Sequence, residues 1–498
     1  MKILAVQQDI SPEIPSLYGN IDYKNYRNTL IKIDQILDQG QLEDRLIESA
    51  LINWMRKENK NPAEFVNSKA YAKQWKHFQL ALRCNIARQL TDESFRDFSV
   101  HLADSRLFIW FTRLETFNIK KATSKSAQER FSKLFDAEII HEQLQQWQAD
   151  VLMDKNKAKT LGLNEAFDCR DVFMDTTCIK ANIHFPVDWV LLRDAVKSLL
   201  LAIKTIRAQG LKHRMIEPAD LMKQMNQLSI SMTHTRRKKD GKAQRKTILR
   251  SMKKLSRCVS KHAERYRKLL DKNGEKTNWS EAQIKQVMSR IDNVLDQLPV
   301  AIKQAHERII GERVVASQDK ILSLYDPDVH VIVRGKAGGE VEFGSGFLLT
   351  EQREGLILDW QLFKDQPKAD SSLLKSSITR IQTKYGNPNA VAGDRGFHSK
   401  ANDEWLAKQG IYNAVCPKAP LQLSERMVEH EFKSMQTRRS QTEGRIGIFK
   451  NVFLGKPLKS KGYPNKAISI GISVLTHNLW VIARKALADE KERLKLAA

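Results

Sequence analysis

Short apolar segments that are rich in β-branched residues alternate along this chain with long stretches of helical periodicity. Val172 to Thr177 and Ala390 to Gly393 have the composition of buried strands, and the second runs into the turn-like sequence Asp394-Arg395-Gly396. The runs "HVIVRG", "VEFGSGFLLT" and "GLILDWQLF" are separated by polar and glycine-containing segments. This pattern predicts an antiparallel meander joined to further strands in one mixed sheet.

Helical periodicity dominates the rest of the sequence. In residues 94–114, apolar side chains recur at helical spacing, and Ala103-Asp104-Ser105 is the expected turn between two helices. Further helices are predicted near residues 371–384, 400–408 and 467–487, with a strand at 411–415. The sequence therefore predicts an α+β fold, a mixed sheet with flanking helices.

The distance between Asp175 and Asp394 is too long for a minimal sheet, and residues 190–318 between them are helical in pattern throughout. We therefore predict four segments. Residues 1–165 form an N-terminal helical domain, 166–189 the first part of the core, 190–318 a basic α-helical insertion, and 319–498 the second part of the core with a C-terminal helix.

Charge narrows the class of partner. The 498 residues include 83 Lys and Arg against 58 Asp and Glu, a net charge of +25, and a chain this basic usually binds a polyanion such as DNA. Residues 236–268 hold fifteen basic and two acidic side chains, with apolar residues at helical spacing between them. We interpret this segment as an amphipathic helix whose basic side grips phosphate, the alternative being a solvated face. The DNA-binding candidates here are Arg236, Arg237, Lys238 and Lys239.

The N-terminal helical domain is a second candidate for binding DNA, although a packing or dimerisation role fits its pattern as well. The sequence contains no apolar run of about 18 residues, so no membrane span is predicted. The five cysteines are scattered and form no Cys-x2-Cys pair, so disulfides and structural zinc are not expected. A cytosolic protein without membrane association is the resulting expectation.

Three acidic residues stand in distinctive contexts: Asp175 in "DVFMDTTCI", Asp394 in "AVAGDRGFHS" and Glu443 in "RRSQTEGRIGIFK". Two strand-end aspartates and a helix-borne glutamate can converge on one point, where their mutual repulsion calls for metal cations. Arg439 and Lys450 lie four residues before and seven after Glu443. At about 100° per residue all three would share one helix face, with a cation on each side of the carboxylate.

These motifs resemble those of bacterial insertion-sequence DDE transposases with a Tyr-x2-Arg-x3-Glu-x6-Lys signature. Arg439, Glu443 and Lys450 fill three of its four places, and Gln436 stands where the family has tyrosine. Asp394-Arg395-Gly396-Phe397 resembles the family's Asp-x-Gly-Phe/Tyr element, and Asp175-Thr176-Thr177 its first aspartate strand. The resemblance covers residues 171–486.

The resemblance implies a ribonuclease H-like core in a cytoplasmic bacterial enzyme. Asp175, Asp394 and Glu443 would be the catalytic residues and would hold two Mg²⁺ ions, with Mn²⁺ as a substitute. Arg439 and Lys450 would position the scissile backbone. The partners would be double-stranded DNA, at the element ends and the target, and a second copy of the chain in the DNA complex.

The expected activity is metal-dependent strand cleavage and strand transfer, the same in-line displacement with water or a 3′-hydroxyl as nucleophile. Two alternatives stay open: a catalytically silent DNA-binding protein derived from a transposase, and a stand-alone ribonuclease H-like nuclease. Asp359 in "LILDWQLF" is the rival metal ligand should Asp175 fail.

Overall fold

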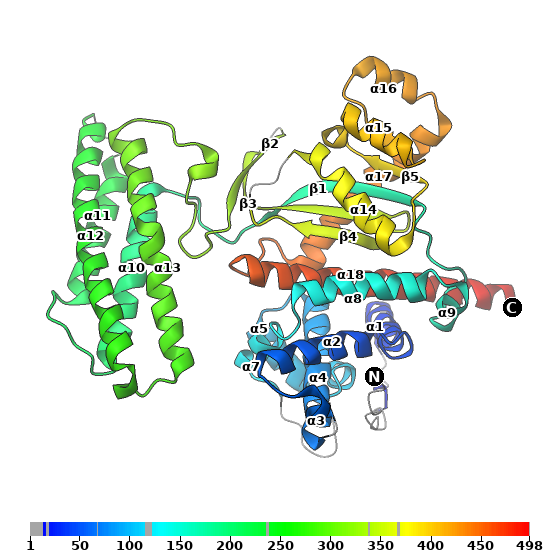
Figure 1. Ribbon diagram of the computed structural model, residues 1–498, viewed down its shortest axis with the longest axis horizontal. Helices are drawn as coiled ribbons and strands as arrows, with labels where there is room; N and C mark the ends of the chain where they lie inside the picture. Colours follow the sequence, from blue (N-terminus) through cyan, green and yellow to red (C-terminus); the bar gives the residue numbers. More distant parts are fainter. Residues whose placement is uncertain are drawn as a thin grey trace. The chain divides into compact units, whose positions relative to one another are not determined.

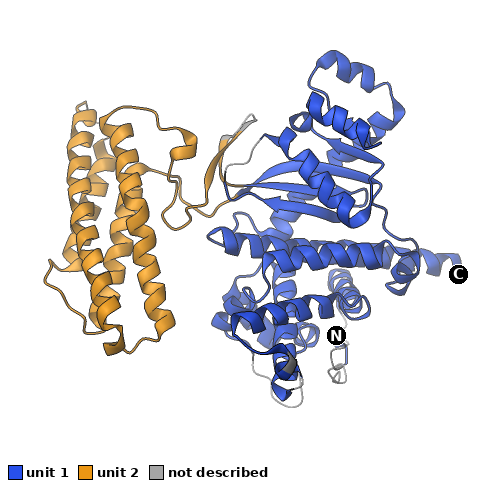
Figure 2. Ribbon diagram, viewed as in Figure 1, with its two compact units in different colours: residues 1–179, 346–498 blue, residues 180–345 orange. Residues whose placement is uncertain are grey.

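The structure, a computed structural model, describes residues 13–15, 19–66, 68–114, 122–235, 239–336, 339–365 and 369–497. It divides into two compact units (Figure 2). Unit 1 contains residues 1–179 and 346–498, and unit 2 contains residues 180–345. The sequence analysis predicted four segments, and this division into two units does not test their boundaries.

A mixed sheet of six strands confirms the predicted α+β class (Figure 1). Its strands are β1 (Asp171–Lys180), β2 (His330–Lys336), β3 (Gly339–Gln352), β4 (Ile357–Leu362), β5 (Ala390–Gly393) and β6 (Tyr412–Val415). The order is β2-β3-β1-β5-β6, and β4 also pairs with β3. The predicted meander is present, because β3 pairs antiparallel with β2 through its first half and with β4 through its second half. Strands β1, β5 and β6 run parallel to one another.

Strand β1 explains the position of the first aspartate. Val172, Phe173 and Met174 are fully buried, as expected for a parallel strand that is covered on both faces. The strand continues through Lys180, so the expectation that Asp175 closes its strand is wrong. Asp175 instead lies in mid-strand, next to the point where the shorter β5 ends.

Nine helices precede β1 in the part of the chain that the structure describes, which confirms the predicted helical character of this region. They are α1 (Ile21–Gln39), α2 (Leu42–Lys57), α3 (Pro62–Val66), α4 (Lys69–Thr91), α5 (Phe95–Asp104), α6 (Arg106–Phe111), α7 (Lys125–Phe131), α8 (Ala137–Trp147) and α9 (Lys155–Thr160), with the π-helical turn η1 (Gln148–Leu152). The predicted break between two helices is present, but α5 continues through Asp104, so of the predicted turn at residues 103–105 only Ser105 lies between α5 and α6, where it caps α6.

The C-terminal helix joins the N-terminal helices to the sheet. Helix α18 (Tyr463–Ala497) packs against α1, α4 and α8, and Figure 1 shows α8 and α18 side by side beneath the sheet. One hydrophobic cluster includes Leu30 of α1, Leu358 of β4 and Leu475 of α18. Helix α18 is long and apolar enough to cross a membrane by composition, but 72% of that apolar stretch is buried inside the protein. This environment is typical of a core helix.

The remaining elements of unit 1 follow the predicted alternation. They are η6 (Asp370–Ser372), α14 (Leu374–Tyr385), η7 (Arg395–Phe397), α15 (Lys400–Lys408), α16 (Pro420–Arg426), α17 (His430–Ile448) and η8 (Phe449–Leu454). Helix α14 packs on β4, and α17 packs on β5 and β6. The helices predicted near residues 371–384 and 400–408 are confirmed.

Unit 2 contains the predicted helical insertion as four long helices with a core of their own. These are α10 (Asp188–Ala208), α11 (Pro218–His234), α12 (Gly241–Asn273) and α13 (Glu281–Ala305), accompanied by η3 (Gly274–Lys276), η4 (His306–Ile310) and η5 (Ser317–Asp319). Leu199 of α10, Met225 of α11 and Tyr266 of α12 belong to one buried cluster. A capping box between Ser280 and Gln283 marks the start of α13.

Candidate functional site

The two aspartates meet where β1 and β5 lie side by side. The parallel register pairs Asp171, Val172 and Phe173 with residues 390, 391 and 392, and its continuation brings Asp175 opposite Asp394. Burial and, second to it, the neighbouring charge of Asp394 together raise the pKa of Asp175 to about 7. A carboxyl group that titrates near neutrality, beside a second carboxylate, is characteristic of a functional site.

Backbone amides orient both carboxylates. Oδ1 of Asp175 accepts a hydrogen bond from the Thr176 amide, and Oδ1 of Asp394 accepts one from the Gly396 amide, each at 2.8 Å. Asp394 thereby caps the short helix η7. Position 396 has no room for a side chain, because a Cβ there would lie 2.6 Å from Oδ2 of Asp370 and 3.0 Å from Oδ1 of Asp394.

Helix α17 carries the third acidic residue within electrostatic reach of Asp175. Its buried side carries Phe432, Met435, Arg438, Thr442 and Ile446. The Glu443 side chain is 59% exposed, and its Oε1 lies 3.9 Å from Nη1 of Arg439. The Glu443 charge contributes to the raised pKa of Asp175, whereas Arg439 acts to lower it. Asp175 is therefore within electrostatic range of both other predicted carboxylates.

The donor set suits a hard divalent cation, although the side chains are not gathered around a point. Among the described residues, no three His, Cys, Asp or Glu side chains are grouped closely enough to hold a metal ion. The donors at this site are carboxylate oxygens, which Mg²⁺ and Mn²⁺ prefer. Because Asp175 is destabilised in its ionised form, a cation bound there would relieve the repulsion.

Gln436 fastens α17 to the ends of two strands. Its Nε2 donates hydrogen bonds to the carbonyl oxygens of Gly393 (3.3 Å) and Ala414 (2.6 Å). Its Oε1 accepts a hydrogen bond from Nε of Arg439 at 3.0 Å. Gln436 thus holds the helix beside Asp394 and orients Arg439.

Lys450 occupies a different environment from Glu443. It lies in η8, the π-helical turn that follows α17, and only 9% of the residue is exposed. Its Nζ donates to Oγ1 of Thr177 (3.0 Å) and to the carbonyl of Cys178 (2.8 Å) in β1. The sequence predicted that Arg439, Glu443 and Lys450 share one helix face with a cation on each side of the carboxylate; the Lys450 amine is instead buried against β1, in the π-helical turn that follows α17.

Two residues near the site, Asp370 and Arg438, were not predicted from the sequence. Asp370 in η6 accepts a hydrogen bond from the Thr176 side chain, and burial followed by the Asp394 charge raises its pKa. No motif marks this residue. Arg438 is buried, pairs with Glu351 at 2.9 Å and lies 4.5 Å from the centroid of the Phe173 ring. The helical spacing of Arg438 from the buried Phe432, Met435 and Ile446 could have indicated that it lies on the buried side of α17.

Asp359, the rival ligand, is held in a structural ion pair. It is fully buried on β4 and accepts hydrogen bonds from Arg380 (2.9 and 2.7 Å) and from Ser377 (2.7 Å). Burial alone would raise the pKa of Asp359, but the nearby His141 ring, 3.5 Å away, and the hydrogen-bonded Arg380 keep it below its ordinary value. Its charge is already compensated, which leaves no need for a metal.

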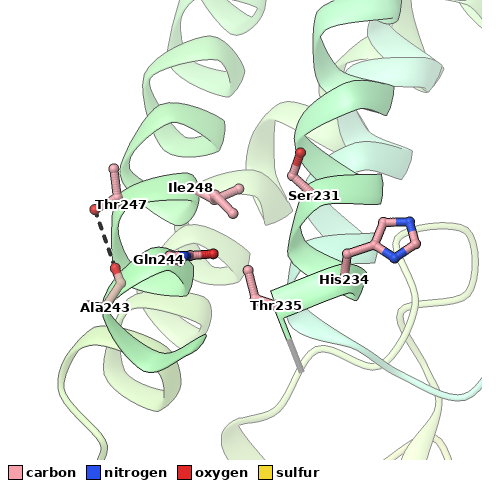
Figure 3. Close-up of a pocket in the computed structure, with 7 residues that line it drawn as sticks. All are labelled: Ser231, His234, Thr235, Ala243, Gln244, Thr247 and Ile248. Carbon is pink, nitrogen blue, oxygen red and sulfur yellow. Dashed lines mark hydrogen bonds between the residues drawn. The ribbon is translucent and has the colours of Figure 1, made fainter. Parts of the chain in front are cut away.

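The basic segment of unit 2 is described from Lys239 onward. Arg236, Arg237 and Lys238 lie outside the described residues, and Lys239 is exposed in the turn before α12. Next to this turn, a pocket opens between the end of α11 and the start of α12 (Figure 3). Its lining consists of Ser231, His234, Thr235, Ala243, Gln244, Thr247 and Ile248. This lining includes no carboxylate or cysteine and a single imidazole, so we do not consider the pocket a catalytic site.

No known protein-family model, curated protein or solved structure matches this chain.

Proposed function

We propose that the protein is a DNA transposase of the insertion-sequence DDE class, with a ribonuclease H-like core. The observation that carries the proposal is the electrostatic coupling of Asp175, Asp394 and Glu443, which come from two parallel strands and one helix. The fold supports it by analogy, since a β4-β3 antiparallel pair joined through β3 to the parallel strands β1, β5 and β6, with α17 after β6, is the arrangement expected of a ribonuclease H-like core, to which β2 is an addition on β3.

In this proposal Asp175, Asp394 and Glu443 would hold two Mg²⁺ ions. The bound ions would lower the pKa of the attacking water or 3′-hydroxyl and stabilise the leaving 3′-oxygen. Asp175 and Asp394 provide ligands on the sheet, and the exposed Glu443 closes the site from α17. Arg439, tied to Gln436, offers its remaining guanidinium donors to a phosphate oxygen.

Lys450 acts through β1 in this scheme. Because its amine is bonded to Thr177 and Cys178, it holds the strand that carries Asp175 and does not contact the scissile backbone directly. We further propose that two copies of the chain assemble on the element ends, in the bacterial cytoplasm.

The test uses a duplex that carries the DNA flanking the protein's own gene, incubated with and without Mg²⁺. Cleavage followed by joining to a second duplex is the expected result, and Asp394→Asn and Glu443→Gln should abolish both while leaving DNA binding intact. Glu431→Gln, on an exposed position of the same helix, is the matched control and should remain active.

The other outcomes separate the alternatives. Cleavage without joining identifies a stand-alone nuclease. Binding with no Mg²⁺-dependent cleavage identifies a silent DNA-binding protein. Cleavage by the Asp394→Asn or Glu443→Gln variant at the wild-type rate refutes the acidic site itself.

A further inference from the structure

The outer face of α12 carries a continuous line of exposed cations, which we call the basic row. It consists of Arg250, Lys254, Arg257, Lys261, Arg265, Lys268 and Lys272, all of them exposed. Successive members are three or four residues apart. At about 100° per residue, the whole row falls within an arc of roughly 80° on the helix.

The basic row points away from the core of unit 2. The buried residues of α12 include Leu249, Met252, Val259, Tyr266 and Leu270, and the same helical geometry centres them roughly 170° from the row. They pack into the cluster shared with α10, α11 and α13. The row is therefore the solvent side of an amphipathic helix, free of the bundle.

The basic row carries seven positive charges, and the exposed Glu264 at its edge is an acidic neighbour on the same side of α12. Between described residues, no carboxylate forms a salt bridge with any member of the row; the α12 cations that do form them are Lys242, Lys246 and Arg267. Neighbouring like charges at these spacings repel one another. The repulsion reaches Lys253, whose pKa is lowered by burial first and then by Arg257 and Arg250. A face that only meets solvent normally mixes both signs.

The length of the row matches one turn of duplex DNA. Arg250 and Lys272 are 22 residues apart, about 33 Å along an α-helix, against roughly 34–36 Å for a turn of B-DNA. All seven members are Lys or Arg, without an Asn or Gln to read adenine edges. The exposed Lys212 and Arg214 flank His213, which bonds to Arg265 at 3.2 Å, and extend the cationic surface.

We propose that the basic row is a sequence-independent binding face for duplex DNA, which follows the phosphates over about one helical turn. This inference deepens the proposed function, since it names where unit 2 contacts DNA. It does not require the acidic site to be catalytic. It also adds the body of α12 to the DNA contact predicted at the start of the segment, at residues 236–239.

The first experiment compares two variants of the full chain in EDTA, where binding is measured without metal-dependent cleavage. The row variant combines Lys254→Gln, Arg257→Gln, Lys261→Gln and Lys268→Gln. The control combines Lys204→Gln, Lys223→Gln, Arg290→Gln and Lys303→Gln, which are exposed positions on α10, α11 and α13. Both variants lose the same charge from the same unit, and circular dichroism at 222 nm checks that both are folded.

The row variant should bind a random-sequence 30-base-pair duplex far more weakly than the control. If all four side chains contact phosphate, the slope of log affinity against log salt falls by about 3 to 4, and affinity at 0.15 M salt falls roughly 10²- to 10³-fold. If the two variants lose the same amount of DNA affinity, the loss comes from net charge and not from the basic row, and the proposal is overturned. An unchanged slope in the row variant would also overturn it.

Cys258 provides a direct footprint, because it is the exposed cysteine of the five and lies on α12 beside Arg257. Duplex DNA should protect Cys258 from maleimide in the wild type and much less in the row variant. Protection by vesicles of anionic lipid but not by duplex would assign the face to a membrane and overturn the proposal. If DNA protects Cys258 but the protein never cleaves DNA, the binding face is supported and the proposed catalytic function is rejected. If the protein cleaves DNA but DNA does not protect Cys258, the catalytic function is supported and the binding face is rejected.

Discussion

Replacing Asp175 with asparagine should stabilise the metal-free protein at neutral and alkaline pH. The pKa of this carboxyl is about 7 in the folded protein, against an ordinary value of 3.8. An acid whose pKa is raised on folding binds its proton more tightly in the folded state. Stability is therefore lost as the pH rises from about 4 through about 7, and the full deficit is present above pH 7.

The magnitude follows from the two pKa values. Each pH unit between them corresponds to about 1.4 kcal/mol, so ionised Asp175 lowers the free energy of unfolding by about 4 kcal/mol. Asparagine removes the charge and keeps an oxygen that can accept from the Thr176 amide. It also gives up the attraction to Arg439, so we expect a gain of about 2 to 4 kcal/mol.

The assay is urea unfolding in EDTA at pH 5, 6, 7 and 8, for the wild type, Asp175→Asn and the control Asp171→Asn. Asp171 lies on the same strand but is paired with Arg353 at 2.7 Å, so its replacement should bring no gain. The advantage of Asp175→Asn should grow with pH and level off near pH 8. A variant that is equal to or less stable than the wild type at pH 8, or an advantage that is independent of pH, would refute the reasoning.

Three further predictions follow from the same contacts. The Mg²⁺ concentration for half-maximal cleavage should fall about tenfold between pH 6 and pH 8 in a titration, because the ionised fraction of a group with a pKa of about 7 rises from about a tenth to nine tenths. Arg438→Ala should lower the free energy of unfolding by about 3 kcal/mol because it removes the cation nearest to the buried Glu351 charge, which then keeps only Arg445 at 3.5 Å and the Thr442 hydroxyl; the double variant Arg438→Met, Glu351→Leu should recover most of this in the same urea assay. Gln436→Ala should reduce the cleavage rate more than DNA affinity, since it frees Arg439 and the strand carbonyls; single-turnover cleavage beside a binding titration measures both.

Local patterns were sufficient to predict most secondary structure. The apolar runs around Asp175 and Asp394 predicted β1 and β5, and the periodicity of residues 190–318 predicted the helices of unit 2. These signals are local because a strand or helix reports its burial through the spacing of its own apolar residues. The amphipathic character of α12 followed from the same rule.

Contacts between distant segments decided the chemistry of individual side chains. The π-helical turn after Ile448 carries Lys450 into β1, and the packing of α17 buries Arg438 while leaving Arg439 beside the acidic residues. Asp370 reaches the site from η6 without any motif. The charge state and availability of these groups depend on which surfaces meet, and that information is absent from the spacing of residues along the chain.

By itself, the sequence determined the elements, the charge and the three acidic candidates. Only the tertiary structure decided that the Asp359 carboxylate is paired with Arg380. It also decided that the Asp175 carboxylate lies beside the like charge of Asp394, which raises its pKa. The two aspartates look alike in sequence, since each lies within a buried strand. They differ because a carboxylate's pKa depends on the charges and solvent within a few ångströms, and folding alone brings those together.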